Sequence, residues 1–177
     1  NPFALGVPDG ENGSALVIDQ SASVIAKSEI MMHARAGKPI PEGWALDADG
    51  KPTTDAEVAL KGSMAPSGGY KGFGVGLMVE IFAAALAGAT LGKDASPFAG
   101  PAGGPPKTGQ FFIAISPEGF SGNGFASRIQ DLTKAISAQP NARLPGSQRQ
   151  AQRPARDSDG VDIDEELLTR IETFARS

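Results

Sequence analysis

The chain has 177 residues, and its 16 lysines and arginines against 20 aspartates and glutamates give a formal net charge of −4 at pH 7. Hydrophobic residues make up 40% of it and charged residues 20%, which is enough for the core of one ordinary domain and excludes both a highly charged disordered chain and an overall basic nucleic-acid-binding protein. Cysteine is absent, so disulfides and thiolate metal sites are excluded. We see no secretory leader and no apolar run of the roughly 20 residues that a bilayer requires, and we expect a cytoplasmic protein with no membrane partner.

The first strong signals are two short apolar segments. Residues 1–8 are bounded by proline and glycine and indicate an edge strand or an extended segment, and residues 14–19 indicate a buried strand. The polar turn at 9–13 would join them as a hairpin with a loop longer than two residues. The 23 glycines and 14 prolines of the chain predict many further turns and long loops.

Helical patterns follow the hairpin. Apolar spacing predicts a helix over about 24–36, capped by Ser21 or Ser23. Residues 38–54 are rich in turn signals and predict a loop, and residues 55–60 predict a short helix with acidic residues in its first turn.

The middle of the chain is glycine-rich and then strongly apolar. The glycine loop 68–74 leads into a helix over 75–91, which has Glu80 as its only charge and is therefore expected to be buried in a larger protein. Residues 92–109 form a long loop of a kind that is often functional. The clearest strand signal of the chain lies at 110–116.

The last third predicts two helices separated by an uneven charge distribution. Residues 125–137 have the apolar periodicity of an amphipathic helix, and residues 164–176 predict a last helix that a capping box starting at Asp162 would open. Between them, residues 143–156 contain four arginines and no acid, whereas residues 157–166 contain six acids and no base.

The first candidate site is the segment 69–74. Its glycines allow a backbone to approach a ligand closely, and Lys71 places a positive charge at a helix start, where anions bind well. This combination suits a phosphate or a carboxylate. The segment is neither a Walker A loop, because Gly72 follows Lys71, nor a Rossmann loop. The alternative is a flexible turn into a buried helix with a surface lysine.

Two further segments carry suitable chemistry. Residues 143–149 place two arginines around a Pro-Gly turn with a hydroxyl, which suits phosphate, and the alternative is a solvated basic loop. Residues 19–23 end the second strand and lead into the next helix, a place where ligands often bind, and the alternative is capping of that helix. The basic segment lacks interleaved aromatic residues, so we do not expect a nucleic-acid partner.

No catalytic set can be assembled from the chain. His33 is the only histidine, and we expect it to be structural or on the surface. No serine stands in a nucleophile-elbow context and no carboxylates have the spacing of metal ligands, so no metal site is predicted.

Several segments, taken together, resemble a known family. The matching segments are 1–8, 16–23, 37–47, 50–55, 68–74 and 143–146. In this order the sequence resembles the type 2 malate/L-lactate dehydrogenases, NAD(P)-dependent 2-hydroxyacid oxidoreductases that include sulfolactate, ureidoglycolate and piperideine-2-carboxylate enzymes.

The resemblance implies a mixed α/β (α+β) fold that is not a Rossmann fold, with a largely antiparallel central sheet flanked by helices. It implies a cofactor-binding domain over 1–142, incomplete without a preceding N-terminal region, and a basic loop with a C-terminal helical arm over 143–177. It also implies that NAD or NADP binds here. The residues that it places at the cofactor are Asp19, Gln20, Ser21, Lys71, Pro145, Gly146 and Ser147. To these we add Gly72, whose backbone permits a close approach, and Arg143 and Arg149 as candidates for contact with a 2′-phosphate. Gln20 departs from the methionine that often follows the aspartate in the family.

The resemblance further implies hydride transfer between nicotinamide and a small 2-hydroxy, 2-oxo or cyclic imino acid, such as malate or lactate, in a homodimer. The family's catalytic histidine lies in a front half that precedes the segment matched by 1–8. We therefore expect this chain to be a C-terminal portion, inactive alone, that a complementary N-terminal polypeptide completes. The rival hypothesis is a non-catalytic interaction or structural module in which the apolar helix 75–91 contacts a partner.

Overall fold

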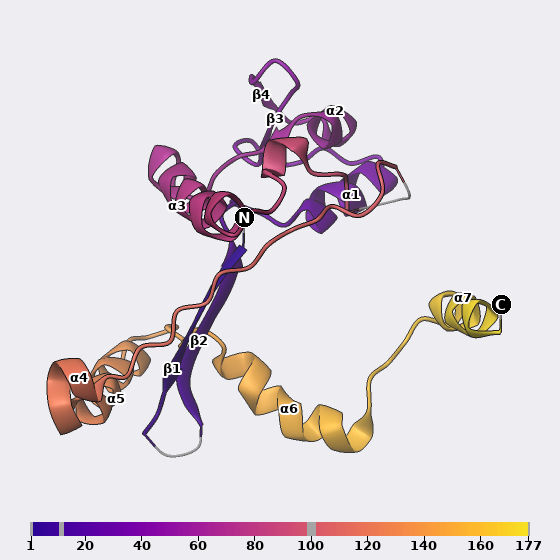
Figure 1. Ribbon diagram of the computed structural model, residues 1–177. Coiled ribbons are helices and arrows are strands. Elements are labelled where there is room, and N and C mark those ends of the chain that lie inside the picture. The colour runs from indigo at the N-terminus through magenta and orange to yellow at the C-terminus, as the bar shows by residue number, and fades with distance from the viewer. Residues whose placement is uncertain (1, 11–12, 99–101, 177) are drawn as a thin grey trace. The chain divides into compact units, whose positions relative to one another are not determined.

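The computed structural model describes residues 2–10, 13–98 and 102–176. The chain divides into two compact units. The first unit comprises Asn1–Leu5 and Ile18–Phe125, and the second comprises Gly6–Val17 and Ala126–Ser177. Figure 1 shows the elements in chain order. Within the described ranges, no helix is long and apolar enough to cross a membrane.

The two segments at the start of the chain are strands, as predicted. β1 (Pro2–Pro8) and β2 (Ser14–Ser21) pair in a two-stranded sheet. β2 extends two residues beyond the predicted strand. Because of this extension, the candidate residues Gln20 and Ser21 lie with Asp19 among the last, exposed residues of the strand and not in the loop expected after it.

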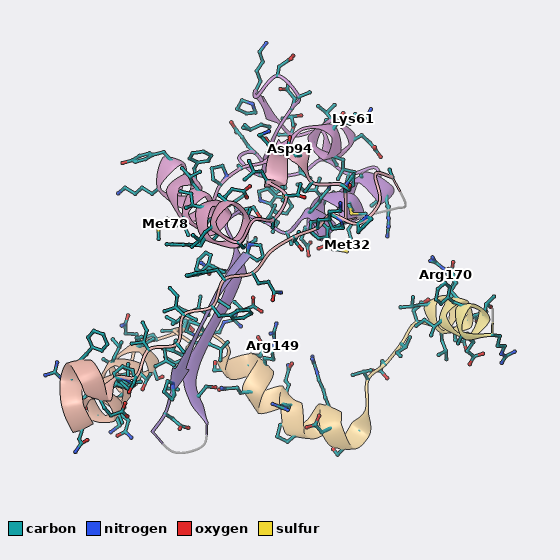
Figure 2. All side chains as sticks on the ribbon, viewed as in Figure 1. Met32, Lys61, Met78, Asp94, Arg149 and Arg170 are labelled. Atoms are coloured by element: carbon teal, nitrogen blue, oxygen red, sulfur yellow. The ribbon has the colours of Figure 1, made fainter. Side chains whose placement is uncertain are left out.

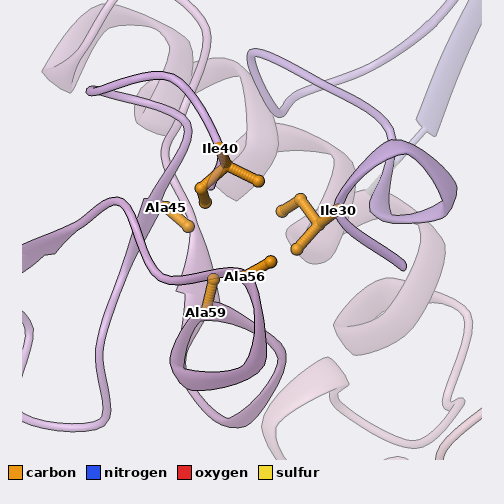
Figure 3. Close-up of a cluster of buried hydrophobic side chains, with 5 residues drawn as sticks. All are labelled: Ile30, Ile40, Ala45, Ala56 and Ala59. Atoms are coloured by element: carbon orange, nitrogen blue, oxygen red, sulfur yellow. The ribbon is translucent and has the colours of Figure 1, made fainter. Parts of the chain in front are cut away.

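The main hydrophobic core belongs to the first unit and lies between two helices and a small sheet. α1 (Lys27–Arg35) packs against α2 (Ala56–Lys61). Figure 3 shows the fully buried side chains, which are Ile30, Ile40, Ala45, Ala56 and Ala59. Three of the five are alanines, so the backbones of these elements approach closely around the two large side chains, Ile30 and Ile40.

The small sheet lies in a region that the sequence predicts to be a loop, so that prediction is wrong in part. β3 (Ala45–Leu46) pairs antiparallel with β4 (Pro52–Thr53) on one side and with β5 (Ser63–Met64) on the other. The turn between β3 and β4 is fixed by Asp47, whose carboxylate accepts hydrogen bonds from the N–H groups of Asp49 and Lys51. Strands of two residues are too short to show an alternating pattern.

α1 begins three residues later than predicted, and its predicted serine cap is wrong. The Ser23 hydroxyl donates to the carbonyl of Ile25 at 2.8 Å, and the Val24 N–H donates to the carbonyl of Ala65 at 2.9 Å. These bonds hold the segment before α1 in an extended conformation. Ala26 is then the N-cap residue, and no side chain caps the helix.

α2 confirms the predicted short helix and shows how it is capped. The Asp55 carboxylate accepts hydrogen bonds from the N–H groups of Glu57 (2.9 Å) and Val58 (3.0 Å). An aspartate at this position stabilises a helix by satisfying N–H groups that have no partner within the helix.

The apolar helix begins earlier than predicted and is not buried within this chain. α3 (Tyr70–Glu80) continues directly into the π-helical segment η1 (Ile81–Leu86), so the predicted glycine loop 68–74 is largely the first turns of a helix. Gly76 and Ala84 are its buried residues. The described residues cover only one narrow side of the helix, so its burial in a larger protein stays a prediction.

The strand predicted at 110–116 is not formed within the described chain. The short η2 (Gly92–Asp94) follows η1, and residues 110–116 then run without pairing to any strand in the described part of the chain. A strand requires a neighbour to satisfy its backbone groups. Two short helical turns follow, α4 (Glu118–Ser121) and η3 (Gly122–Gly124).

Helices dominate the rest of the chain. α5 (Phe125–Ser137) confirms the predicted amphipathic helix. The predicted basic loop is instead largely a helix, α6 (Ser147–Asp159), which begins after Gly146 at φ 82°. α7 (Glu165–Ala175) confirms the predicted last helix, but its cap is Asp164, which accepts from the N–H groups of Glu166 and Leu167, and not Asp162.

These elements make a mixed α/β protein with small sheets and helices. The described strands form two separate sheets, of two and three strands, instead of the single central sheet that the sequence led us to expect.

Candidate functional site

Two of the predicted site segments meet because the chain pairs the residues after β2 with the residues before α3. Ser23 and Pro66 form an isolated antiparallel bridge. The N–H of Ser67 donates to the carbonyl of Ala22 at 2.8 Å, next to the bond from Val24 to Ala65. These bonds place the end of β2 beside the start of α3, although more than 40 residues separate them.

Glycines in α3 allow this close approach. A Cβ atom on Gly76 would lie 3.2 Å from the Cβ of Ala22, so α3 lies directly against the end of β2. A Cβ atom on Gly72 would overlap the carbonyl oxygen of Ser67. Gly72 therefore has a structural role in the turn before the helix, in addition to any role toward a ligand.

An open groove of about 800 Å³ lies along this junction. One side is formed by α3 and η1, and the others by residues 22–23, by Met64 and Pro66, and by residues 91–93. Apolar side chains such as Phe73, Leu77 and Ile81 form much of its lining. A groove with apolar walls and a few polar groups is typical of a small-molecule or cofactor site.

The polar side chains of the groove are Ser23, Glu80 and Lys93. The half-buried Glu80 carboxylate accepts a hydrogen bond from the N–H of Gly92 at 2.6 Å, which ties η2 to the end of α3. The exposed ammonium of Lys93 forms an ion pair with its neighbour Asp94 at 2.7 Å. Glu80 stands out in the sequence as the one charge of an apolar helix, whereas Lys93 was missed because it lies in a long loop without a motif.

Lys71 lies at the edge of this arrangement. It is exposed, in the first turn of α3, and the next residue, Gly72, lines the groove. The N-cap residue Gly69 has φ 63°, a conformation that favours glycine, and leaves the first N–H groups of α3 without a side-chain cap. An ammonium group beside uncapped helix N–H groups is a favourable environment for an anion.

Ser21 is connected to the same groove. Its hydroxyl lies 2.9 Å from the hydroxyl of Ser23, which lines the groove. The structure thus brings parts of the predicted segments 19–23 and 69–74 to one groove, which Ala22, Ser23, Gly72 and Phe73 line. Asp19 and Gln20 precede Ser21 at the exposed end of β2.

The third predicted segment belongs to the second unit and has its own local structure. The N–H of Val17 donates to the carbonyl of Pro145 at 3.1 Å, and Gly146 packs against Val17. The Ser147 hydroxyl donates to the carbonyl of Leu144 at 2.8 Å, and the Arg143 guanidinium donates to the side chain of Gln148 at 2.7 Å. These contacts fix the start of α6.

Arg149 lies in the first turns of α6, and its side chain is labelled in Figure 2. It is exposed, as is Arg143. The first turn of α6 thus carries Ser147 and Arg149, and Arg143 lies four residues before it.

His33 has a structural environment. Its Nδ1 atom lies 2.7 Å from the carbonyl oxygen of Pro39, and its ring packs edge-on against Trp44 with 5.5 Å between the ring centres. Across the described residues, no three His, Asp or Glu side chains form a group that could hold a metal ion.

The sequence is similar to that of several bacterial enzymes. It is 40% identical over 177 residues to a (2R)-3-sulfolactate dehydrogenase (NADP(+)) from Chromohalobacter salexigens, covering 100% of this chain and 52% of the relative. It is 42% identical over 174 residues to a Delta(1)-pyrroline-2-carboxylate reductase from Pseudomonas fluorescens, covering 97% and 51%. The chain therefore spans about half the length of the curated relatives that it matches.

The fold is similar to that of a solved enzyme. The crystal structure of a delta1-piperideine-2-carboxylate reductase from Pseudomonas syringae superposes with a TM-score of 0.84 at 33% identity, covering 98% of this chain and 52% of that one. The sequence model of the malate/L-lactate dehydrogenase family matches residues 1–172. The chain belongs to the malate/L-lactate dehydrogenase family.

Proposed function

We propose that the protein is an NAD(P)-dependent oxidoreductase that transfers a hydride between nicotinamide and a small acid with an oxidisable or reducible C2 atom. The observation that carries this proposal is the family match over 1–172. Relatives with about 40% identity are named for sulfolactate and for pyrroline-2-carboxylate. These two acids are therefore better candidate substrates than the malate or lactate that the resemblance first suggested.

The residues around the groove fit a nicotinamide dinucleotide. The Lys71 ammonium and the uncapped N–H groups at the start of α3 suit the negative charge of a pyrophosphate. The apolar side chains of the groove suit a flat ring, and the hydroxyl of Ser23 together with the carboxylate of Glu80 supply hydrogen-bonding groups for a ribose or an amide.

When bound, the dinucleotide would supply the hydride chemistry, and the protein would orient it. In this proposal Lys71 offsets the phosphate charge, and Gly72 supports the helix start because its lack of a side chain lets the Ser67 carbonyl pack against it. The bond from Gly92 to Glu80 holds the far side of the groove in place.

We propose that the complete enzyme contains a second half of similar length. The chain spans about half of its relatives, and no acid–base catalytic set can be assembled from its sequence. We assign the catalytic groups to a complementary N-terminal polypeptide segment and this chain to the C-terminal half, with a cofactor domain over 1–142 and an arm over 143–177. A homodimer and a cytoplasmic location remain predictions of the same proposal.

The decisive test of the site is the exchange of Lys71 for alanine in the polypeptide joined to its complementary half. Loss of a hydrogen bond to a charged group costs about 1.5–3 kcal/mol, so Lys71→Ala should weaken NADPH binding by roughly 10-fold to 150-fold in a fluorescence titration. Lys51→Ala, an exposed lysine of the β3–β4 turn, serves as the matched control. Equal affinities of the two variants would remove Lys71 from the site.

We further propose that Arg149 determines whether the protein prefers NADPH over NADH. If its guanidinium binds the 2′-phosphate, Arg149→Ala should weaken NADPH binding by about 1.5–3 kcal/mol and leave NADH binding unchanged. Arg170→Ala, in the exposed helix α7, is the control for a general loss of positive charge. An equal loss for both dinucleotides would contradict the assignment.

The alternative function is a non-catalytic interaction module. The large exposed apolar area on α3 and η1 favours it, because such areas mark interaction sites. The two functions differ in one measurement: absence of NADH and NADPH binding in the joined polypeptide would favour the alternative.

A further inference from the structure

Residues 110–116, Gln-Phe-Phe-Ile-Ala-Ile-Ser, have the composition of a strand that is covered on both faces. All five positions from Phe111 to Ile115 are apolar. Strands with one exposed face alternate apolar and polar residues, whereas a continuous apolar run is typical of a strand buried on both faces. The chemistry of this segment thus requires cover from two sides.

The structure leaves the segment uncovered. Phe112 is 83% exposed, Ile113 69% and Ile115 68%. Within the described residues, the backbone N–H and C=O groups of 110–116 make no hydrogen bond to the rest of the chain. An exposed, apolar and unpaired strand is a template for pairing with another strand.

One end of the segment is nevertheless fixed to the first unit. The N–H of Thr90 donates to the carbonyl of Lys107 at 3.2 Å, and a Cβ atom on Gly109 would overlap the carbonyl oxygen of Ala83. The ring of Phe111 stacks on the ring of Phe82 with 4.9 Å between the ring centres and 14° between the planes. The segment therefore starts from a defined position on η1.

The helix that holds this end is itself short of cover. Met78 and Leu86, which are not among the residues that line the groove, are 58% and 64% exposed, and Figure 2 labels the Met78 side chain on α3. Contiguous exposed apolar areas of this kind mark interaction sites.

We propose that residues 110–116 form a strand whose partner is a β-strand from the complementary half of the same polypeptide. Pairing would satisfy the backbone groups of 110–116 and bury Phe112, Ile113 and Ile115. This inference rests on the proposed function insofar as that function includes a complementary half. It adds which residues of this chain receive that half.

The length of the relatives favours this occupant over a second copy. The match to the sulfolactate dehydrogenase covers all of this chain but only 52% of the relative. The relative therefore contains nearly the same number of residues outside the matched part. That length can supply a partner strand and the layers on both of its faces. Two copies of 110–116 paired edge to edge would satisfy one edge and leave the faces exposed.

Hydrogen exchange of backbone amides tests the proposal directly. In the isolated chain, the amides of 111–115 should exchange at the rate of an unfolded peptide, because no backbone hydrogen bond holds them. In the polypeptide joined to its complementary half they should be protected by at least roughly 100-fold, since ladder hydrogen bonds of a buried strand open rarely. Equal, unprotected exchange in both forms would overturn the proposal.

A pair of proline variants gives an independent test, because it measures the association of the two halves and not the exchange of backbone amides. Ile113→Pro removes the N–H that a partner strand requires, whereas Ala102→Pro places the same residue in an exposed loop. With the two halves expressed separately, Ile113→Pro should reduce their association by at least about tenfold and Ala102→Pro should not. Both variants should leave the thermal unfolding of the isolated chain unchanged, and equal association of the two variants would contradict the pairing.

The outcomes separate this inference from the proposed function. Dinucleotide binding by the joined polypeptide with unprotected 111–115 would overturn the strand pairing and leave the function standing. Protection of 111–115 without dinucleotide binding would support the strand pairing and overturn the proposed function. Protection in the isolated chain together with a dimer in light scattering would identify a second copy as the partner and overturn the proposed occupant.

Discussion

Two neighbouring regions of the first unit, residues 27–64 and residues 70–116, use their apolar residues in opposite ways. The first buries Ile30, Ile40 and three alanines in a core of its own. The second exposes most of its large apolar side chains. Tyr70, for example, is 82% exposed, and Phe112 is 83% exposed. Apolar content alone therefore does not tell whether a segment builds a core or receives a partner.

The difference follows from how the apolar residues are distributed. In 27–64 they are separated by polar residues and by turns, so each element has one apolar side that another local element covers. In 70–116 they form continuous runs, so each element has apolar residues on every side. One short chain can cover only one of those sides.

The largest expected effect tests whether 27–64 is a self-sufficient core. Ile30→Ala should lower the free energy of unfolding by about 2–5 kcal/mol, because it leaves a cavity around a side chain that is 1% exposed. Met32→Ala, on the same helix and 52% exposed, should change it by less than about 0.5 kcal/mol. Urea unfolding of the isolated chain measures both. Similar losses for the two would show that this region has no core of its own.

A smaller effect compares two helix caps with the same chemistry. Asp55→Ala removes the cap of α2, which contributes two residues to the core, and should cost about 1 kcal/mol in urea unfolding. Asp164→Ala removes the equivalent cap of α7, whose described residues are all exposed. It should reduce helix content in circular dichroism without moving the unfolding midpoint. A shift of the midpoint by Asp164→Ala would mean that α7 folds together with the core.

The smallest effect concerns the end of the unpaired segment. The Ser116 hydroxyl donates to the Glu118 carboxylate and, with a backbone hydrogen bond, holds the pKa of that carboxyl below its usual value. A lowered pKa means that this contribution to stability is present above the unfolded-state pKa and is lost as the pH falls through the folded-state pKa. Ser116→Ala should raise the Glu118 pKa toward its usual value in an NMR titration. Ser121→Ala, whose hydroxyl bonds to a backbone carbonyl instead, is the control, and an unchanged Glu118 pKa in Ser116→Ala would show that the serine hydroxyl does not lower it.

Parts of the fold could be predicted because their signals are local. α5 has a clear helical period, and β1 and β2 are apolar segments joined by a polar turn. α6 was missed because its residues are almost all polar and Pro154 lies inside it. The strand at 110–116 was predicted for a sound reason, its composition, but pairing depends on a neighbour that the described chain does not contain.

The candidate site was also predictable where its signals are local and unpredictable where it depends on long-range contacts. Lys71 and Ser21 could be selected from the sequence because glycines, hydroxyls and charges near helix starts are local signals. The groove could not, because it depends on the pairing of 22–24 with 65–67. Lys93 lines the groove because its neighbour Gly92 donates a hydrogen bond to Glu80. This bond joins residues 12 positions apart, and no sequence motif predicts it.

The tight packing of Gly72 on Ser67 has a consequence for binding kinetics. Since the backbone before α3 is already locked against itself, a dinucleotide arriving at this helix start would meet a preorganised surface instead of a loop that must first lose conformational entropy. Any larger residue at this position would separate the helix from the turn that supports it. Such a substitution would then slow the association of the dinucleotide and also weaken its affinity.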